Sequence, residues 1–142
     1  MTTKNYQELI EHGIFIGGAD DAVEVMKNER VDLIVDLRAE STNISLDSNR
    51  VHCPIVDDAD QQDGSVNKAI NLVVNSYSDG KKVFFHCGGG SNRTGTVAIG
   101  TLLALGKANT IAEAEEKAKA IRSKINVKPA MKDSLKRMFP DA

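Results

Sequence analysis

Residues 82–105 read KVFFHCGGGSNRTGTVAIGTLLAL, and this stretch decides the fold. Residues 82–86 carry aromatic and β-branched side chains, which favour a strand, and the glycines at 88–90 interrupt that pattern. Residues 94–105 are apolar and long enough to form a buried helix. The stretch therefore predicts a buried strand, a glycine-rich loop and a buried helix in direct succession.

The rest of the chain alternates between the same two patterns. Strand-like runs lie at residues 13–17, 31–37 and 51–56, and the polar residues 57–64 predict a loop. Apolar residues at helical spacing predict further helices. We expect one after Asp20 and Asp21, which can cap it, one over residues 66–77, one from Thr110 with an apolar face that runs to Ile125, and one over residues 129–139.

Strands that alternate with helices of this length are typical of an α/β domain. We therefore expect a single domain over residues 1–142, with a largely parallel central sheet of about five strands and helices on both faces. Ligands of such sheets bind at the carboxyl ends of the strands. The glycine-rich loop lies at one of these ends.

Composition and charge exclude several classes of protein. The 142 residues include 18 basic and 20 acidic side chains, whereas a nucleic-acid partner usually requires a basic excess. No apolar run is long enough to span a bilayer as a helix, and the first residues lack the apolar stretch of a secretory signal. We expect a cytoplasmic monomer without a membrane partner. Cys53 and Cys87 are expected to be thiols, and no residue spacing indicates a metal site.

Residues 86–95 contain the candidate catalytic and anion-binding residues. Glycines at 88–90 let the backbone curl so that N–H groups point inward, and such a nest at a helix N-terminus suits a phosphate dianion. The same positive field favours a thiolate at Cys87, placed for in-line attack on a bound phosphorus atom. Arg93 can add a bidentate fork. The candidate phosphate-binding residues are therefore Gly88, Gly89, Gly90, Ser91, Asn92 and Arg93.

The motif His-Cys-x-x-Gly-x-x-Arg-Thr resembles the signature of cysteine-dependent protein-tyrosine phosphatases. It is formed here by His86, Cys87, Gly90, Arg93 and Thr94. The short chain makes the dual-specificity branch the closer match. Other segments also resemble that branch, namely residues 14–18, 35–38 and 121–135, so the resemblance covers nearly the whole chain.

The resemblance implies a two-step hydrolysis through a phosphocysteine intermediate, without a metal or another cofactor. Cys87 would be the nucleophile, and Arg93 with the loop amides would hold the equatorial oxygens. Thr94 matches the residue that hydrogen-bonds the thiolate and helps it to leave in the second step. His86 matches the histidine that orders the loop and tunes the cysteine without acting as a base.

The family also uses an aspartic acid on a separate loop to protonate the leaving oxygen. It follows a short Pro-containing strand, and residues 54–58 of this chain read PIVDD. Asp57 lies 30 positions before Cys87, and Asp58 and Asp60 are close enough to compete. The acid must be protonated when the substrate binds, and neighbouring carboxylates favour the protonated form. We place Asp57 first, then Asp58, then Asp60.

The expected substrate is a phosphorylated protein side chain, either phosphotyrosine or phosphoserine and phosphothreonine. The interior of the loop contains no lysine or arginine, whereas family members that act on phosphoinositides resemble a pattern with basic residues there. Arg38 and Glu40 are candidate rim residues. Other hypotheses are a small non-protein phosphate ester, a non-catalytic pseudophosphatase and, more distantly, a rhodanese-type sulfurtransferase. A reversible disulfide between Cys53 and Cys87, as in some family members, also stays open.

Overall fold

The computed structural model describes residues 5–39, 49–56 and 62–142. The strands are β1 (Gln7–Ile10), β2 (Ile14–Gly18), β3 (Leu33–Arg38), β4 (Arg50–Ile55) and β5 (Val83–Cys87). They form one sheet in the order β1-β2-β5-β3-β4, in which β1 at the edge is antiparallel and the other neighbours are parallel. The predicted α/β fold with a largely parallel sheet is confirmed.

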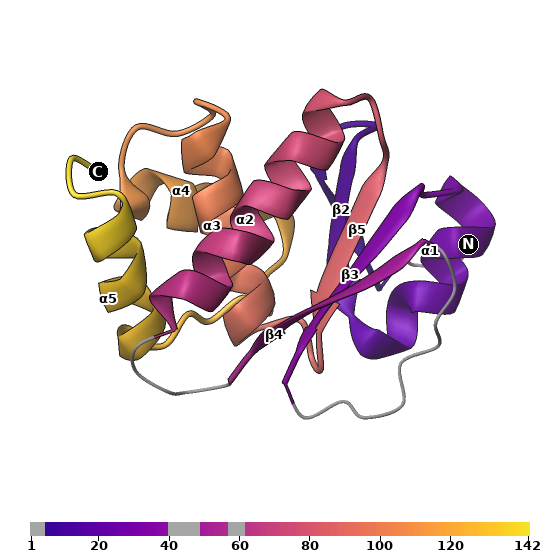
Figure 1. Cartoon of the computed structure of the whole chain (residues 1–142), viewed down its shortest axis with the longest axis horizontal. Helices are drawn as coiled ribbons and strands as arrows, with labels where there is room; N and C mark the ends of the chain where they lie inside the picture. Colours follow the sequence, from indigo (N-terminus) through magenta and orange to yellow (C-terminus); the bar gives the residue numbers. More distant parts are fainter. Residues whose placement is uncertain (1–4, 40–48, 57–61) are drawn as a thin grey trace.

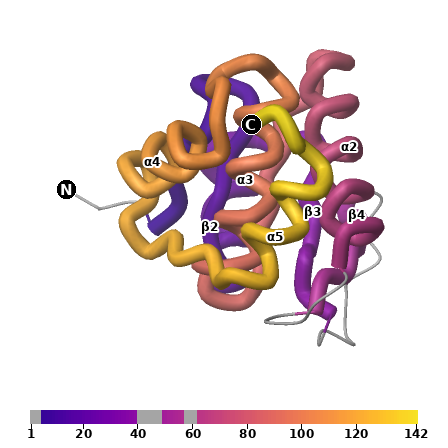
Figure 2. The backbone as a smooth tube through the Cα atoms, turned by 90° about the vertical axis from the view of Figure 1, so that its left-hand side faces the viewer, coloured from indigo at the N-terminus to yellow at the C-terminus, as the bar shows by residue number. Residues whose placement is uncertain are grey.

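Helices cover both faces of the sheet, as the sequence predicts. They are α1 (Ala22–Glu29), α2 (Asp63–Ser78), α3 (Asn92–Ala104), α4 (Ile111–Ile121) and α5 (Pro129–Met138), with a short 3-10 helix, η1 (Ala19–Asp21), before α1. α1 packs on one face, and the other four helices lie on the opposite side, where α5 packs against α2 and α3 (Figure 1). Seen from the side, α3, α4 and α5 lie in front of the sheet (Figure 2). Within the described residues, no helix is long and apolar enough to cross a membrane.

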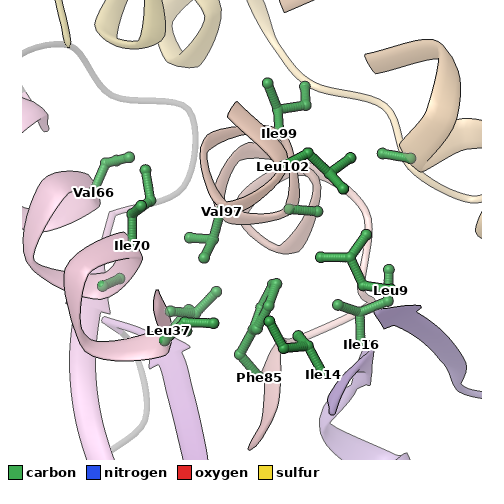
Figure 3. Packing of buried hydrophobic residues seen from close by; sticks show 14 of the residues in the cluster. Leu9, Ile14, Ile16, Leu37, Val66, Ile70, Phe85, Val97, Ile99 and Leu102 are labelled. Carbon is green, nitrogen blue, oxygen red and sulfur yellow. The ribbon is translucent and has the colours of Figure 1, made fainter. Parts of the chain in front are cut away.

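β5 lies at the centre of the sheet and is buried along its whole length. Successive side chains of a strand point to opposite faces, so Phe85 and Cys87 belong to the core under α2 and α3, whereas Phe84 belongs to the smaller core under α1. Figure 3 shows Phe85 facing Val97 of α3 in the larger core. This alternation puts the thiol of Cys87 on the face of the sheet that α3 covers.

Four details of the sequence prediction were wrong. β1 was not predicted, because Gln7 and Glu8 give this short edge strand no apolar pattern. Asp21 does not cap α1 with its side chain, which instead accepts a hydrogen bond from the N–H of Gly18. The loop predicted over residues 57–64 is too long, because α2 begins at Asp63. Ile125 is buried but lies beyond the end of α4.

Candidate active site

The loop that follows β5 lies at the carboxyl edge of the sheet, between the ends of β2 and β3 (Figure 1). The helix that follows it, α3, begins at Asn92, two residues earlier than the sequence predicts. Residues 92–102 of this helix are all buried, so its first turn lies inside the protein. The loop therefore sits at a helix N-terminus, where the helix dipole and unsatisfied N–H groups favour an anion.

The carbonyl oxygens of the loop point away from its interior and are hydrogen-bonded there. The oxygen of Gly88 accepts from the N–H of Ala19 at 3.0 Å, and the oxygen of Ser91 accepts from the N–H of Gly95 at 3.2 Å. The oxygens of Gly89 and Gly90 accept from the guanidinium of Arg122 at 3.2 and 2.8 Å. In a planar trans peptide the N–H points opposite to the C=O. The N–H groups of residues 89–92 are therefore turned toward the other side, an arrangement of backbone donors that favours an anion.

Gly90 is the residue for which this conformation requires a glycine. Its φ of 73° lies in the left-handed region, and a Cβ there would approach the oxygen of Gly17 to 2.7 Å. Both the backbone angle and the close contact with β2 exclude a side chain. The glycine at this position of the motif thus has a local structural cause.

The Cys87 thiol and the Thr94 hydroxyl are in contact beneath the loop. Both residues are buried, and Oγ1 of Thr94 lies 3.1 Å from Sγ of Cys87. The same Oγ1 accepts a hydrogen bond from the N–H of Cys87 at 3.0 Å and lies 3.3 Å from the oxygen of Gly17. A hydroxyl has one proton to donate, so it serves either the sulfur or the Gly17 carbonyl. A thiolate would draw this proton to the sulfur, because hydrogen bonds to charged acceptors are stronger.

Arg93 is buried in the first turn of α3, with 5% of its surface exposed. Its Nη1 donates a hydrogen bond to the carbonyl oxygen of Ile55 at 3.1 Å. Ile55 ends β4 and precedes Asp57 by two residues. The three candidate acids, Asp57, Asp58 and Asp60, lie outside the described residues.

His86 lies on the opposite face of β5 from Cys87. Its ring stacks on Phe84 with the centroids 5.4 Å apart, and Nδ1 is 3.1 Å from the carbonyl oxygen of Cys87. Burial lowers the pKa of His86, although the hydrogen bond to Cys87 and the charge of Asp36 partly oppose this. A neutral ring with its proton on Nδ1 satisfies the Cys87 carbonyl, which fixes the backbone where the loop begins.

Sequence reasoning missed Asp36, which pairs with His86 in the parallel ladder between β3 and β5. Its buried carboxylate accepts two hydrogen bonds from the guanidinium of Arg38, at 3.0 and 2.8 Å. Burial alone would raise the pKa of Asp36, but the hydrogen bonds from Arg38 outweigh it and the pKa is lowered. The feature of the sequence that could have revealed Asp36 is an acidic residue inside an otherwise apolar strand. Of the two candidate rim residues, Arg38 is hydrogen-bonded to Asp36. Glu40 lies outside the described residues.

The connection between α4 and α5 supports the loop from behind. The side-chain oxygen of Asn92 accepts a hydrogen bond from the N–H of Lys128 at 2.8 Å, which ties the first residue of α3 to this connection. Arg122, which sequence reasoning also missed, is 3% exposed and reaches the loop from the end of α4. It continues the buried stripe of Ala114 and Ala118 at a spacing of four residues. The feature of the sequence that could have revealed Arg122 is a positively charged residue on the buried face of a helix.

A disulfide between Cys53 and Cys87 does not fit the sheet. Both thiols are free and buried, but β3 separates β4 from β5. Neighbouring strands lie about 4.8 Å apart, so these two cysteines are roughly 9–10 Å apart. A disulfide requires Cα atoms within about 7 Å. Burial also raises the pKa of the Cys53 thiol, which makes it a poor nucleophile.

Comparisons with known proteins agree with this architecture. Residues 14–139 match the model of the dual specificity phosphatase catalytic domain. Among solved structures, Tk-PTP in its active form is 20% identical over 99% of this chain and 100% of its own, with a TM-score of 0.82. Human DUSP28 is 16% identical over 96% and 93%, with a TM-score of 0.81, and PTPMT1 in complex with PI(5)P is 19% identical over 96% and 95%, with a TM-score of 0.80.

At these sequence identities, the similarity to the solved structures shows a shared fold. No curated protein sequence matches the chain. The family model, in contrast, spans all the described elements from β2 to α5. This chain belongs to the dual specificity phosphatase catalytic domain family.

Proposed function

We propose that this phosphatase domain hydrolyses phosphate monoesters of proteins, with phosphotyrosine as the leading substrate, through a phosphocysteine on Cys87. One observation carries the proposal. Sγ of Cys87 lies 3.1 Å from the Thr94 hydroxyl, at the start of a loop whose carbonyl oxygens are all bonded on its outer side. A nucleophile, a donor that stabilises its anion and an anion-binding nest thus occur together.

In the first step the thiolate of Cys87 attacks phosphorus. An S–P bond forms, the P–O bond to the substrate oxygen breaks, and Asp57 gives its proton to that oxygen. In the second step water attacks the phosphocysteine, Asp57 takes a proton from the water, and the S–P bond breaks. Thr94 then donates its hydroxyl proton in a hydrogen bond to the departing thiolate, a contact that the 3.1 Å separation supports.

Two contacts connect the candidate loop of Asp57 to the phosphate-binding loop. Arg93 is expected to bind the phosphoryl oxygens, and its Nη1 also donates to the carbonyl of Ile55, two residues before Asp57. The N–H of Val56 donates to the side chain of Gln62, which joins the two ends of the intervening segment. These contacts tie the strand that leads to Asp57 to the phosphate-binding arginine.

The proposed protein substrate rests on the charge of the loop. Residues 88–92 contain no lysine or arginine, so one guanidinium and backbone N–H groups would hold a single phosphate. A phosphoinositide headgroup with several phosphates would gain more from a basic loop. The phosphoinositide PI(5)P, which accompanies PTPMT1 in one related structure, is therefore the natural competitor substrate to test.

The test is release of phosphate from an aryl phosphate in the presence of a metal chelator. Wild type is expected to turn over and to be inhibited by vanadate, whereas Cys87→Ser is expected to be inactive. Cys53→Ala is the matched control, because it removes the other buried thiol two strands away. Turnover that survives in Cys87→Ser would overturn the mechanism. Faster turnover of short-chain PI(5)P than of a phosphotyrosine peptide would overturn the substrate assignment alone.

A further inference from the structure

Arg122 connects three parts of the protein that are distant in sequence. It follows α4 directly and is 3% exposed. Its Nη1 donates to the carbonyl oxygen of Asn5 at 2.6 Å and to Oε1 of Gln7 at 2.8 Å. Its Nε and Nη2 donate to the oxygens of Gly90 and Gly89. One guanidinium thus ties the N-terminal segment and the phosphate-binding loop to the end of α4.

We propose that Arg122 is a positioning residue that holds the loop in its anion-binding conformation; the inference rests on the proposed function. The argument follows from the peptide units that it holds. Fixing the oxygens of Gly89 and Gly90 outward fixes the N–H groups of Gly90 and Ser91 inward. If either peptide unit flipped, a carbonyl oxygen would replace an N–H group at the anion site and would repel a phosphate.

The loop is held between Arg122 and β2. A Cβ on Gly90 would lie 2.5 Å from Nη2 of Arg122 and 2.7 Å from the oxygen of Gly17. The oxygen of Gly88 is bonded to the N–H of Ala19, just after β2. Because β2 fixes the start of the loop and Arg122 fixes its middle, the loop has contacts that preorganise it before a phosphate arrives.

The charge of Arg122 also suits an anion site. Burial lowers the pKa of Arg122, but the charges of Asp21 and Cys87 oppose this, and an arginine stays protonated in proteins. Its positive charge therefore faces the same region as the nucleophile. This charge favours a bound phosphate.

A lysine cannot reproduce these contacts. The guanidinium is a rigid fork whose Nε and Nη2 reach two successive carbonyl oxygens, while Nη1 reaches the N-terminal segment. A lysine ammonium keeps the charge but is a compact group on a flexible stem, without this planar geometry. Arg122→Lys therefore separates the geometric role from the role of charge, and Arg122→Met removes both.

The test measures binding of orthovanadate by calorimetry in wild type, Arg122→Lys, Arg122→Met and Gln7→Ala. Gln7→Ala is the matched control, because it removes a partner of Arg122 outside the loop. We expect Arg122→Lys to bind vanadate about tenfold more weakly than wild type. The vanadate affinity of Gln7→Ala should stay within about twofold of wild type, even if both variants lower the melting temperature. Arg122→Met, which lacks both the planar fork and the charge, should bind vanadate more weakly than Arg122→Lys.

Equal vanadate affinity in wild type and Arg122→Lys would overturn the inference. An equal loss in Arg122→Lys and Gln7→Ala would also overturn it, because the effect would then be one of stability. A measurement on wild type does not depend on the variants folding: vanadate should shift the amide signals of Gly90 and Ser91 in NMR spectra, and unshifted signals would contradict the proposal. Vanadate binding without turnover would instead refute the proposed function and leave the role of Arg122 intact.

Discussion

Replacing Thr94 by valine tests the contact beneath the phosphate loop. Valine has nearly the shape of threonine, and the change replaces the hydroxyl of this fully buried side chain by a methyl group. The N–H of Cys87 then loses its acceptor at 3.0 Å, which should cost about 1–3 kcal/mol of stability. The departing thiolate also loses its donor at 3.1 Å. A hydrogen bond to a charged group contributes about 1.5–3 kcal/mol, so hydrolysis of the phosphocysteine should slow by roughly 10- to 100-fold.

The assay is pre-steady-state release of the aryl alcohol from an aryl phosphate. Because the loss falls on the second step, Thr94→Val should show a burst equal to the enzyme concentration, followed by slow turnover. Thr94→Ser is the control, since it keeps the hydroxyl and loses only a buried methyl group. If Thr94→Val turned over within about twofold of wild type, or if both variants slowed equally, the contact would have no part in the second step.

Three more changes test other parts of the account. Asp57→Ala should slow hydrolysis of esters with poor leaving groups and flatten the dependence of the rate on pH; if Asp58→Ala does so instead, the acid is one residue further on. Gly18→Ala should impair turnover of an aryl phosphate, because its Cβ would lie 2.9 Å from the oxygen of Gly88, whereas Gly64→Ala meets no atom within 4 Å and should not. In Asp63, hydrogen bonds from Arg137 and Ser134 lower the pKa from 3.8 to about 2. The stability that Asp63 contributes is present above pH 3.8 and is lost as the pH falls through about 2. The Asp63 side chain is 38% exposed, so urea unfolding of Asp63→Ala at neutral pH should show a loss of only about 1 kcal/mol, and this loss should shrink as the pH falls toward 2.

The centre of the fold could be predicted because its signals are local. The strand at β5, the glycines after it and the apolar helix α3 follow one another without a gap, and each has its own residue pattern. The helix expected from Thr110 does begin there, and the hydroxyl oxygen of Thr110 accepts a hydrogen bond from the N–H of Glu113. Such contacts join residues only a few positions apart, so the sequence itself displays them.

The support of the loop could not be predicted, because it depends on distant contacts. Arg122 reaches Gly90 across 32 positions and Asn5 across 117. Asp36 meets His86 only because β3 and β5 become neighbours in the sheet. The local sequence pattern indicates that Arg122 and Asp36 are charged residues at buried positions. Their hydrogen-bonding partners can be identified only once the strands and helices are assembled. For the same reason β1, a short edge strand held by pairing with β2, had no signal of its own.

The most direct test of the account is detection of the phosphocysteine. Wild type and Cys87→Ser would be mixed with an aryl phosphate and quenched rapidly, and the resulting peptides would be mapped by mass spectrometry. Thr94→Val would be included, because a slow second step lets the intermediate accumulate. We predict phosphate on the peptide that contains Cys87 in wild type, more of it in Thr94→Val, and none in Cys87→Ser. Phosphate release without any phosphorylated Cys87, or phosphate on another residue, would contradict the account.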